Sequence, residues 1–361
     1  MKKFIYILIL LAVVFGIYKL VHHKTKAVPV SNNPADQSNL ENSKAENLQP
    51  AINGVLVPAE VAEKRPIAVM VENHPDARPQ SGLVDADLVY EAIAEGGITR
   101  FMAVYQTKSS NNIGPIRSAR VYYATLADEL GAVYAHVGGN SDALANIKAG
   151  LYNRIADADQ FFLDNYFHRI KSRLMPHNVY TSLAKLQQFV NDRKLPDTAT
   201  YQAWQFKDDA PATSSPAKII NVDFSESDFA VKWKYESSNN SYLRFMAGSA
   251  HKDLDSGPFD SAQGRPEPGR TGGKQITAKN IIVQFVTGHS TVTDTIGSQD
   301  FDLVGQGKAK VFLDGKEIDA TWKKQNSGRT RYYDLLGNEI RFNRGSTWVE
   351  IVPADKQISW S

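Results

Sequence analysis

The sequence predicts a multidomain protein of the mixed α+β or α/β class, in which an N-terminal mixed α/β domain precedes a smaller, mainly-β domain of barrel or sandwich form. A single transmembrane helix is expected in front of both domains. Three observations predict this arrangement. Residues 4–21 are almost continuously apolar, short apolar runs alternate with helical patterns over 52–195, and side chains alternate with a period of two from 219 onward. A chain of 361 residues has room for two domains and appendages.

Residues 1–26 are predicted to anchor the chain in the cytoplasmic membrane. The apolar helix 4–21 follows Lys2 and Lys3 and reaches the lower limit of length for a membrane span. Lys19 lies near its far end, where a lysine side chain can extend to the membrane surface. We find no small-x-small cleavage motif and favour an uncleaved signal anchor over a cleaved signal peptide. The short lysine-led start favours a single pass with the folded domains extracytoplasmic.

Three further stretches are predicted to connect or interrupt the domains. Residues 27–51 are rich in Asn, Ser, Pro and charge and have no apolar period, which is typical of a flexible stalk. Residues 196–218 are rich in proline and small polar residues, so we expect an exposed linker. Residues 255–270 are rich in Gly, Pro and charge and interrupt a strand pattern. We interpret them as an inserted disordered loop, with an interaction loop as the alternative.

The first domain, 52–195, is predicted to alternate strands with helices. Apolar runs bounded by turn residues predict strands over 65–72, 87–93, 100–106 and 131–137. Apolar residues at helical spacing predict helices over 118–130, 141–149 and 183–193, with Ser118 and Ser141 as candidate N-caps of the first two. Such alternation is typical of an α/β domain.

The second domain, 219–361, is predicted to consist mainly of strands. In 229–236, Val231, Trp233 and Tyr235 fall on one face and lysines on the other. Aromatic residues in these strands could form a sugar-stacking surface, although strand aromatics more often pack in the core. Further strands are expected over 241–247, 280–286, 309–313, 317–323, 330–334, 339–342 and 347–352.

Composition excludes several classes of function. Lys+Arg number 41 against 39 Asp+Glu, so the chain has no basic excess of the kind that binds nucleic acid. The chain has no cysteine, which excludes disulfides, thiolate metal sites, a cysteine nucleophile and a lipid-modified cysteine. Phosphate-binding glycine motifs, the G-x-S-x-G elbow and H-E-x-x-H are also absent from the sequence. We therefore expect no cofactor and no metal.

Polar side chains gather where the predicted strands of the first domain end. In open α/β sheets, ligands bind where strands end and helices begin, so these side chains would form one cleft if the ends share a rim. The candidate ligand-binding residues are Arg78, Gln80, Ser81, Arg100, Arg117, Ser118, Arg120, Asn140 and Asn178.

One chemistry for this cleft is the binding of an anion. In the segment GPIRSAR, Arg117 and Arg120 stand at the start of a predicted helix. Free backbone N–H groups there favour negative charge, and guanidinium groups suit carboxylate or phosphate. The alternative is that these arginines only pair with Glu91 or Glu95.

A second chemistry is acid–base catalysis, and a third is metal binding. Glu91 and Glu95, which would face the same way in a regular strand, could divide the acid and base roles, with His136 or His177 as proton shuttle. Loop histidines also commonly serve structural hydrogen bonds. His74 with the same two histidines could ligate zinc, but no spacing in the sequence supports a metal site.

Ordered sequence blocks resemble a known family. The blocks RPIAVMVENHPDARPQSGL, VYEAIAEGGITRFMAVYQ, GPIRSAR, HVGGN and MPHNVYTS, followed by VKWKYE, AKNIIVQ, GQGKAKVFLDG and NRGSTWVEIVP, are similar to the YerB-like lipoproteins. The resemblance covers about 58–353 and implies a two-domain bacterial cell-envelope protein of unknown function. The family's usual lipid-modified cysteine is absent here, so anchoring would depend on helix 4–21, and 255–270 is foreign to the family pattern.

Two functions from different classes follow as hypotheses. The first is an envelope binding module that recognises a cell-wall polymer or an envelope protein of wall synthesis through the Arg/Glu/His cleft. The second is a hydrolase of an envelope glycan or peptide that uses Glu91, Glu95, His136 or His177. A third, structural interpretation is that the polar loops only join the two domains.

Overall fold

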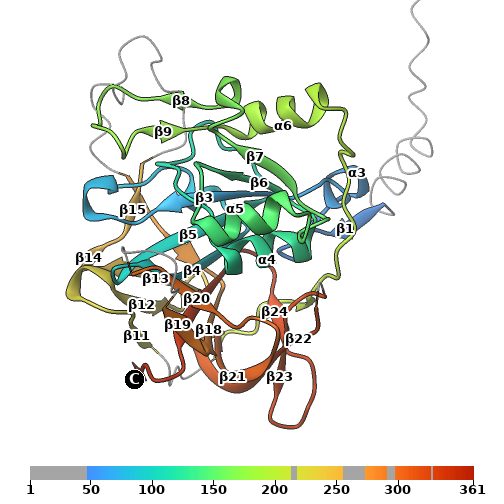
Figure 1. Ribbon diagram of the computed structural model, residues 1–361. Helices are drawn as coiled ribbons and strands as arrows, with labels where there is room; N and C mark the ends of the chain where they lie inside the picture. Colours follow the sequence, from blue (N-terminus) through green and yellow to red (C-terminus); the bar gives the residue numbers. More distant parts are fainter. Residues whose placement is uncertain (1–46, 213–217, 255–272, 291–296, 327) are drawn as a thin grey trace, which may run out of the picture. The chain divides into compact units, whose positions relative to one another are not determined.

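The computed structural model describes residues 47–212, 218–254, 273–290, 297–326 and 328–361. The predicted anchor helix 4–21, the stalk up to residue 46 and the loop 255–270 lie outside the described residues. Leu48–Ser361 form one unit with a shared core (Figure 1). The end of the predicted stalk already belongs to this fold, since Leu48–Pro50 (β1) pairs antiparallel with Leu56–Pro58 (β2). In the part of the chain described, no helix has the length and apolarity to cross a membrane.

A ten-stranded mixed sheet, in the order β23-β22-β21-β18-β25-β4-β5-β3-β6-β7, runs through this unit (Figure 1). The first half of the chain supplies β3 (Ile67–Glu72), β4 (Leu88–Glu95), β5 (Ile98–Tyr105), β6 (Val133–His136) and β7 (Ala156–Asp159). The second half supplies β18 (Asn280–Val286), β21 (Gly305–Leu313), β22 (Lys316–Lys324), β23 (Arg331–Asp334) and β25 (Thr347–Pro353). Parallel pairing of β25 with β4 joins the halves and places Glu350 beside Glu91. The segments 52–195 and 219–361 therefore share one sheet.

Helix α4 (Val121–Leu130) covers one face of this sheet and contacts α5 (Ser141–Lys148). The described chain also has α6 (Leu183–Asp192) and a short α3 (Ala59–Ala62) near the start of the fold. Helix α4 is fixed by tyrosines: Tyr122 donates to the carbonyl of Ile93 at 2.8 Å, and Tyr90 of β4 lies 3.2 Å from Glu129 of α4. Alternate residues of β4, beginning with Tyr90, therefore face α4.

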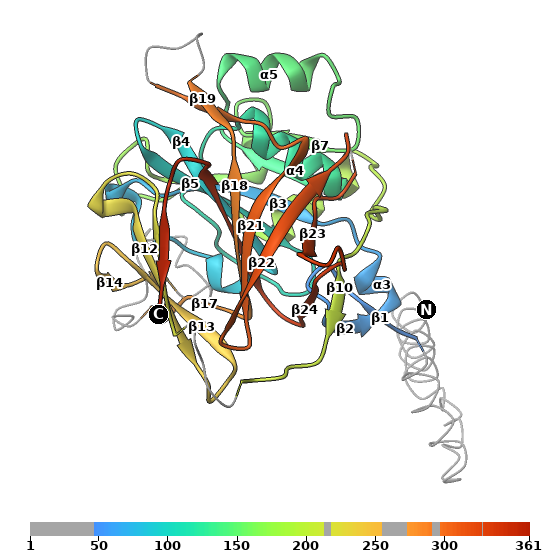
Figure 2. The ribbon, with the colours of Figure 1, turned by 90° about the horizontal axis from the view of Figure 1, so that it is seen from below.

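A six-stranded sheet covers the opposite face of β4 and β25 (Figure 2). Its strands are β11 (Ile219–Asp223), β12 (Ala230–Glu236), β13 (Ser241–Met246), β14 (Ser249–Ala250), β17 (Thr277–Ala278) and β26 (Ile358–Trp360). Trp233 of β12 meets Trp348 of β25 edge-on, with ring centroids 5.4 Å apart. The predicted inward face of β12 is confirmed, and its aromatic residues lie in the core. Most of the described strands of the second half divide between these two layered sheets.

Short paired strands complete the fold. They are β8 (His168–Arg169) with β9 (Val179–Tyr180), β10 (Gln205–Lys207) with β24 (Arg341–Asn343), β15 (Lys252–Asp253) with β16 (Lys274–Gln275), and β19 (Gly288–Ser290) with β20 (Gln299–Phe301). Single 3-10 turns occur at η1 (Pro75–Ala77), η2 (Leu83–Asp85), η3 (Asp164–Tyr166) and η4 (Ser227–Phe229). The predicted linker 196–218 is not exposed throughout, because Trp204 is buried and donates to the carbonyl of Thr330 at 2.8 Å.

The two serine N-caps predicted from the sequence are wrong by one or two residues. Helix α4 begins at Val121 with Arg120 as its N-cap, because the preceding segment stays extended and pairs Ala119 with Gly139. Helix α5 is capped by Asn140, whose side-chain oxygen accepts from the amide of Ala143 at 3.1 Å. Tertiary strand pairing decides both helix starts.

Candidate functional site

The parallel strands β3, β4 and β6 end at the same edge of the large sheet, with Glu72, Glu95 and His136 as their last residues. This edge is the rim that the sequence predicted. The polar residues near it separate into three groups that differ in burial and in the face of the sheet on which they lie.

The first group, the rim cluster, consists of Glu72, His74, Asp76, Arg78, Arg117, Arg173 and His177. Glu72 is nearly buried, and its Oε1 lies 2.9 Å from Nε of Arg117 and 3.0 Å from Nδ1 of His177. The His74 ring stacks on that of His177, with centroids 5.0 Å apart and planes inclined by 19°. The side chains of Arg117 and His177 are 26% and 16% exposed, so solvent reaches the cluster.

Two arginines of the rim cluster hold its loops in place. Arg78 donates from Nε to the side-chain oxygen of Asn73 at 3.1 Å and from Nη2 to its carbonyl at 2.9 Å. Arg173 donates to the carbonyls of Asp76 at 3.0 Å and Pro79 at 2.5 Å. These contacts tie the loop after β3 to the segment between β8 and β9. The positions of His74 and His177 therefore depend on the same arginines.

The second group, the core cluster, consists of Glu91, Trp233, Arg244, His251 and Glu350. Arg244, which is 0% exposed, donates to Glu350 at 2.8 Å, to His251 at 2.9 Å and to the carboxylate of Glu91. The Trp233 indole also donates to Glu350, at 2.8 Å. The guanidinium lies 4.3 Å from the ring centroid of Trp348. A buried cation with this many partners fixes the packing of β13 on β4 and β25.

Electrostatics within the core cluster set two protonation states. Burial raises the pKa of Glu350 to about 8, the charge of Glu91 acts in the same direction, and Arg244 opposes both. Burial, with Arg244 and Arg78, holds the pKa of His251 well below its ordinary value. His251 is thus neutral. Its Nδ1 accepts from Arg244, so Nε2 carries the proton and donates to Gln80 at 3.0 Å.

Buried amides connect the core cluster to the rim cluster. The amide of Gln80 donates to the carbonyl of Glu72 and to the side chain of Asn73, both at 3.0 Å. Asn73 in turn donates to the hydroxyl of Thr99 at 2.7 Å, and Thr99 donates to Glu91 at 2.7 Å. Gln80, predicted as a ligand-binding residue, is a buried link in this chain.

The third group consists of Glu95, Arg100 and Arg120 on the α4 side of the sheet. Glu95 accepts from Arg100 at 2.5 Å and from Arg120, and Arg100 also donates to the carbonyl of Ser118 at 3.0 Å. Burial acts to raise the pKa of Glu95, but the two arginines hold it below its ordinary value. The pairing of Arg120 with Glu95 is the alternative to an anion site that the sequence left open, whereas Arg117 pairs with Glu72 instead.

The prediction that Glu91 and Glu95 face the same way is wrong. A bulge between Ile93 and Glu95 shifts the register of β4 against β5, and Glu95 pairs with Ile98. One extra residue reverses the side from which the following side chain emerges. Glu91 therefore meets Arg244 on the second-sheet side, while Glu95 meets Arg100 on the helix side.

Other predicted site residues have structural contacts outside the rim cluster. His136 is buried, with Nδ1 2.8 Å from the carbonyl of Gly138 and Nε2 2.8 Å from Asp157. Asn178 accepts from Arg169 at 2.8 Å, and Ser81 is buried in a backbone bridge to Gly114. Asn140 is the cap of α5. Of the predicted residues, the structure brings Arg117 and His177 together on Glu72, and Arg78 holds the loop that follows β3.

Two family models match the chain in sequence order. The N-terminal domain of a protein of unknown function (DUF3048) matches residues 53–196, and its C-terminal domain matches residues 220–349. The chain belongs to the DUF3048 family. It is 32% identical over 313 residues to a Bacillus subtilis protein described as "Putative lipoprotein YerB", which covers 86% of this chain and 87% of that protein. The crystal structure of YerB superimposes with a TM-score of 0.72 at 29% identity, over 86% of this chain and 99% of that one. The resemblance inferred from sequence blocks is confirmed.

The core cluster joins the two DUF3048 domains. Glu91 and Gln80 lie within the N-terminal match, Arg244 and His251 within the C-terminal match, and Glu350 directly follows it. A second buried group does the same: Glu129 of α4 lies 2.8 Å from Lys324 and 3.4 Å from Arg329. Buried charges therefore cross the boundary between the family domains at two places.

Sequence reasoning missed Arg244, Glu350 and Arg173. Arg244 lies two residues from each of the buried residues Tyr242 and Met246 in β13. Side chains two apart in a strand share a face, so Arg244 occupies an inward-facing position. A charged residue at such a position requires a buried partner, so the alternation of β13 could have identified Arg244 as part of a buried polar cluster. The identity of that partner follows only from the long-range pairing of β25 with β4.

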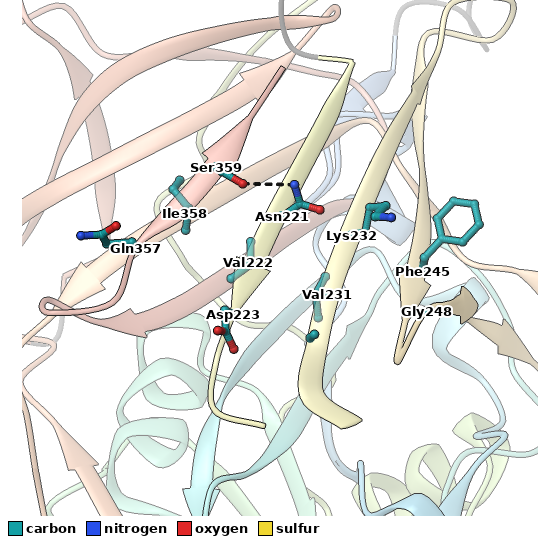
Figure 3. Close-up of a pocket in the computed structure, with 11 residues that line it drawn as sticks. Asn221, Val222, Asp223, Val231, Lys232, Phe245, Gly248, Gln357, Ile358 and Ser359 are labelled. Carbon is teal, nitrogen blue, oxygen red and sulfur yellow. Dashed lines mark hydrogen bonds between the residues drawn. The ribbon is translucent and has the colours of Figure 1, made fainter. Parts of the chain in front are cut away.

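Two surface hollows lie away from these clusters. One, of about 470 Å³, crosses the outer face of the six-stranded sheet, where Asn221 donates to Ser359 at 3.1 Å beside Lys232 and Phe245 (Figure 3). The other, of about 660 Å³, is lined by Trp322 and residues of β18 and β21. Neither is lined by a residue of the rim cluster or the core cluster.

Proposed function

We propose that this chain is an extracytoplasmic, membrane-held binding module that recognises an anionic cell-wall polymer through the rim cluster. The observation that carries the proposal is the contact of Arg117 and His177 with Glu72 at a solvent-accessible rim, where His74 stacks on His177 and Arg173 binds the loop that carries His74. Guanidinium groups bind carboxylates and phosphodiesters through paired N–H donors, and such anions are chemically available in cell-wall polymers.

The charge balance of the rim cluster supports an anionic ligand. Glu72 has one oxygen, Oε1, that serves both Arg117 and His177, so one carboxylate lies against two potential cations. Arg173 directs its hydrogen bonds to two backbone carbonyls, whereas Arg78 packs on the ring of Phe229 and has Glu91 and Asp228 as acidic neighbours. With Glu72 and Asp76 against Arg78, Arg117 and Arg173, the rim cluster has one more arginine than carboxylate, although the whole chain is nearly neutral.

The location of the module rests on the sequence and on its relative. The apolar segment 4–21 with its leading lysines is of the kind that crosses a membrane once. The relative YerB is described as a lipoprotein, a class held at membranes by a lipid on cysteine. Because this chain has no cysteine, the apolar segment would take the place of the lipid.

One observation keeps the hydrolase alternative open. The Glu72–His177 pair has the carboxylate–imidazole arrangement of a general base, and His177 is accessible to solvent. Glu91 does not support this alternative, because it is buried against Arg244. A hydrolase would release soluble fragments from the polymer, whereas a binding module would not.

The test is co-sedimentation of residues 48–361, which form one unit with its own core, with purified cell-wall sacculi. We expect saturable binding that weakens as salt rises from about 0.05 to 0.5 M, because exposed charges are screened. Arg117→Ala should weaken binding by about tenfold, the effect of losing one charge-assisted contact. The matched control is Arg341→Ala, which removes an exposed arginine of β24 that donates to the carbonyl of Phe206 at 3.1 Å.

Three results would count against the proposal. Absence of wild-type binding at low salt would remove its basis and favour a protein partner. Equal loss of binding in Arg117→Ala and Arg341→Ala would indicate non-specific charge attraction. Release of soluble wall fragments during the incubation, abolished by His177→Ala, would favour the hydrolase.

A further inference from the structure

The exposed corner of the rim cluster brings together His74, Asp76 and His177, each of which can place one ligand atom within 4.8 Å of the others. We propose that these three side chains bind a divalent transition-metal ion of the zinc class. Spacing along the chain does not indicate this site, because the two histidines stand about a hundred positions apart. The inference is independent of polymer binding, since it concerns the ion alone.

Glu72 orients His177 in the way that metal-binding histidines are oriented. Nδ1 of His177 donates to Oε1 of Glu72 across 3.0 Å, which leaves Nε2 as the nitrogen with a lone pair. Histidines that ligate metals almost always direct their other ring nitrogen to a carboxylate, carbonyl or water. Glu72 is itself fixed by Arg117 and by its place at the end of a buried strand. It acts as a positioning residue for the site.

His74 and Asp76 lie on one short turn that faces His177. Nδ1 of His74 accepts from the backbone amide of Asp76 at 3.2 Å and lies 3.6 Å from its carboxylate oxygen. Arg78 and Arg173 hold this turn through the hydrogen bonds described above. The two imidazole rings stack at 5.0 Å. The two rings therefore lie face to face before any ion binds, and His74 must release the amide of Asp76 or its Nε2 proton to ligate an ion.

The ligand atoms need only a small movement to close on an ion. Ligand atoms of tetrahedral zinc lie about 3.3 Å apart, so a separation of up to 4.8 Å requires a shift of about 1.5 Å. The His74 and Asp76 side chains are 35% and 74% exposed, so each can rotate without disturbing the core. His177 supplies the fixed ligand.

The chemistry of the ligands selects the class of metal. Two imidazoles with one carboxylate suit zinc and related ions, whereas magnesium and calcium prefer oxygen ligands alone. Oε2 of Glu72 is buried and has no hydrogen-bond partner in the described part of the chain. A cation at the cluster, or water bound to it, would satisfy that oxygen. Three protein ligands leave a fourth position for water or for an anionic oxygen.

The test is calorimetric titration of zinc chloride into residues 48–361 prepared without a histidine tag, at neutral pH and without wall material. We expect one ion per chain, with no competition from a large excess of magnesium. His74→Ala, His177→Ala and Asp76→Asn should each weaken zinc binding at least tenfold. The matched control is His289→Ala, which removes an exposed histidine of β19 and should leave zinc affinity unchanged.

These variants distinguish zinc binding at a defined site from zinc binding to surface histidines in general. Zinc that fails to bind the wild type saturably, or that binds the His74→Ala/His177→Ala double variant as it binds the wild type, would overturn the proposal. If His177→Ala fails to fold, His74→Ala and Asp76→Asn still test it, because both side chains are accessible. The titration contains no polymer, so a negative result with zinc and a negative result with sacculi are independent.

Discussion

The core cluster and the rim cluster contain the same kinds of residue, and burial separates their roles. Each has glutamate, histidine and arginine near the ends of β3 and β4. Glu91 and Arg244 are 0% exposed, whereas Arg117 and His177 at the rim are 26% and 16% exposed. A buried charged group forms its hydrogen bonds with protein partners and so stabilises the packing. A charged group at the surface can still form hydrogen bonds with a ligand. Residue type alone therefore does not identify a site.

The core cluster also differs in what it connects. Its members come from both DUF3048 domains, and Arg244 holds β4 and β25 from the opposite sheet. A buried ion pair adds little net stability compared with apolar residues of similar shape, but removing one partner leaves an unpaired buried charge. This is the domain-joining role that the sequence left open for polar loops, and it is carried by strand residues.

The largest expected effect is the loss of Arg244. Arg244→Met removes the cation between Glu91 and Glu350 and keeps the side-chain length, so two carboxyl groups remain buried together. We expect the free energy of unfolding to fall by about 3–5 kcal/mol, measured by urea denaturation of residues 48–361. Arg341→Ala, at an exposed position, should change it by less than about 0.5 kcal/mol. A core variant as stable as the wild type would show that the cluster does not hold the domains together.

A smaller effect concerns pH. Glu350 has a raised pKa of about 8 in the folded state and an ordinary value of 4.5 when exposed, so between these values the folded chain binds the additional proton. The stability that this proton provides is present below pH 4.5 and is lost as pH rises through 8. From pH 6.5 to 8 the free energy of unfolding should fall by up to about 2 kcal/mol. Glu350→Gln should flatten this slope.

His251 acts in the opposite direction and in another interval. Its pKa is lowered well below 6.5, so the unfolded chain binds the additional proton when pH drops below 6.5. The stability linked to neutral His251 is present above pH 6.5 and is lost as pH falls. Most of the change in the free energy of unfolding between pH 6.5 and 8 is therefore expected from Glu350, because His251 acts mainly below this interval. A wild type and a Glu350→Gln variant with the same slope there would contradict the assigned protonation of Glu350.

Much of the secondary structure could be predicted from the sequence, because local patterns determine it. The strands at 67–72, 280–286 and 347–353 and the helix at 183–192 follow from apolar runs and helical spacing. The joining of β25 to β4 could not be predicted, because it pairs residues more than 250 positions apart. The single large sheet depends on that pairing, and so does the meeting of Glu350 with Glu91.

The position of the candidate site could be predicted from the sequence, but the set of residues that meet there could not. Ends of parallel strands share an edge, so the rim itself could be expected, and the structure places Glu72 there in contact with Arg117. The bulge in β4, which sends Glu95 away from Glu91, has no local sequence signal beyond the glycines that follow it. His74 meets His177 between two loops that lie far apart in the sequence and that Arg173 ties together.

The smallest effect tests a rim residue that we assign to structure rather than to binding. Asn140→Ala removes the side-chain cap of α5, so we expect a loss of about 1 kcal/mol in the free energy of unfolding. Ser141→Ala, the neighbour that local sequence favoured as the cap, should change it by only a few tenths of that amount, because its side chain accepts no cap hydrogen bond from α5. Both variants should bind sacculi as the wild type does. Loss of binding in soluble, folded Asn140→Ala would extend the ligand surface beyond the rim cluster to the start of α5, and the distinction drawn between structural and binding residues of the rim would then fail at this position.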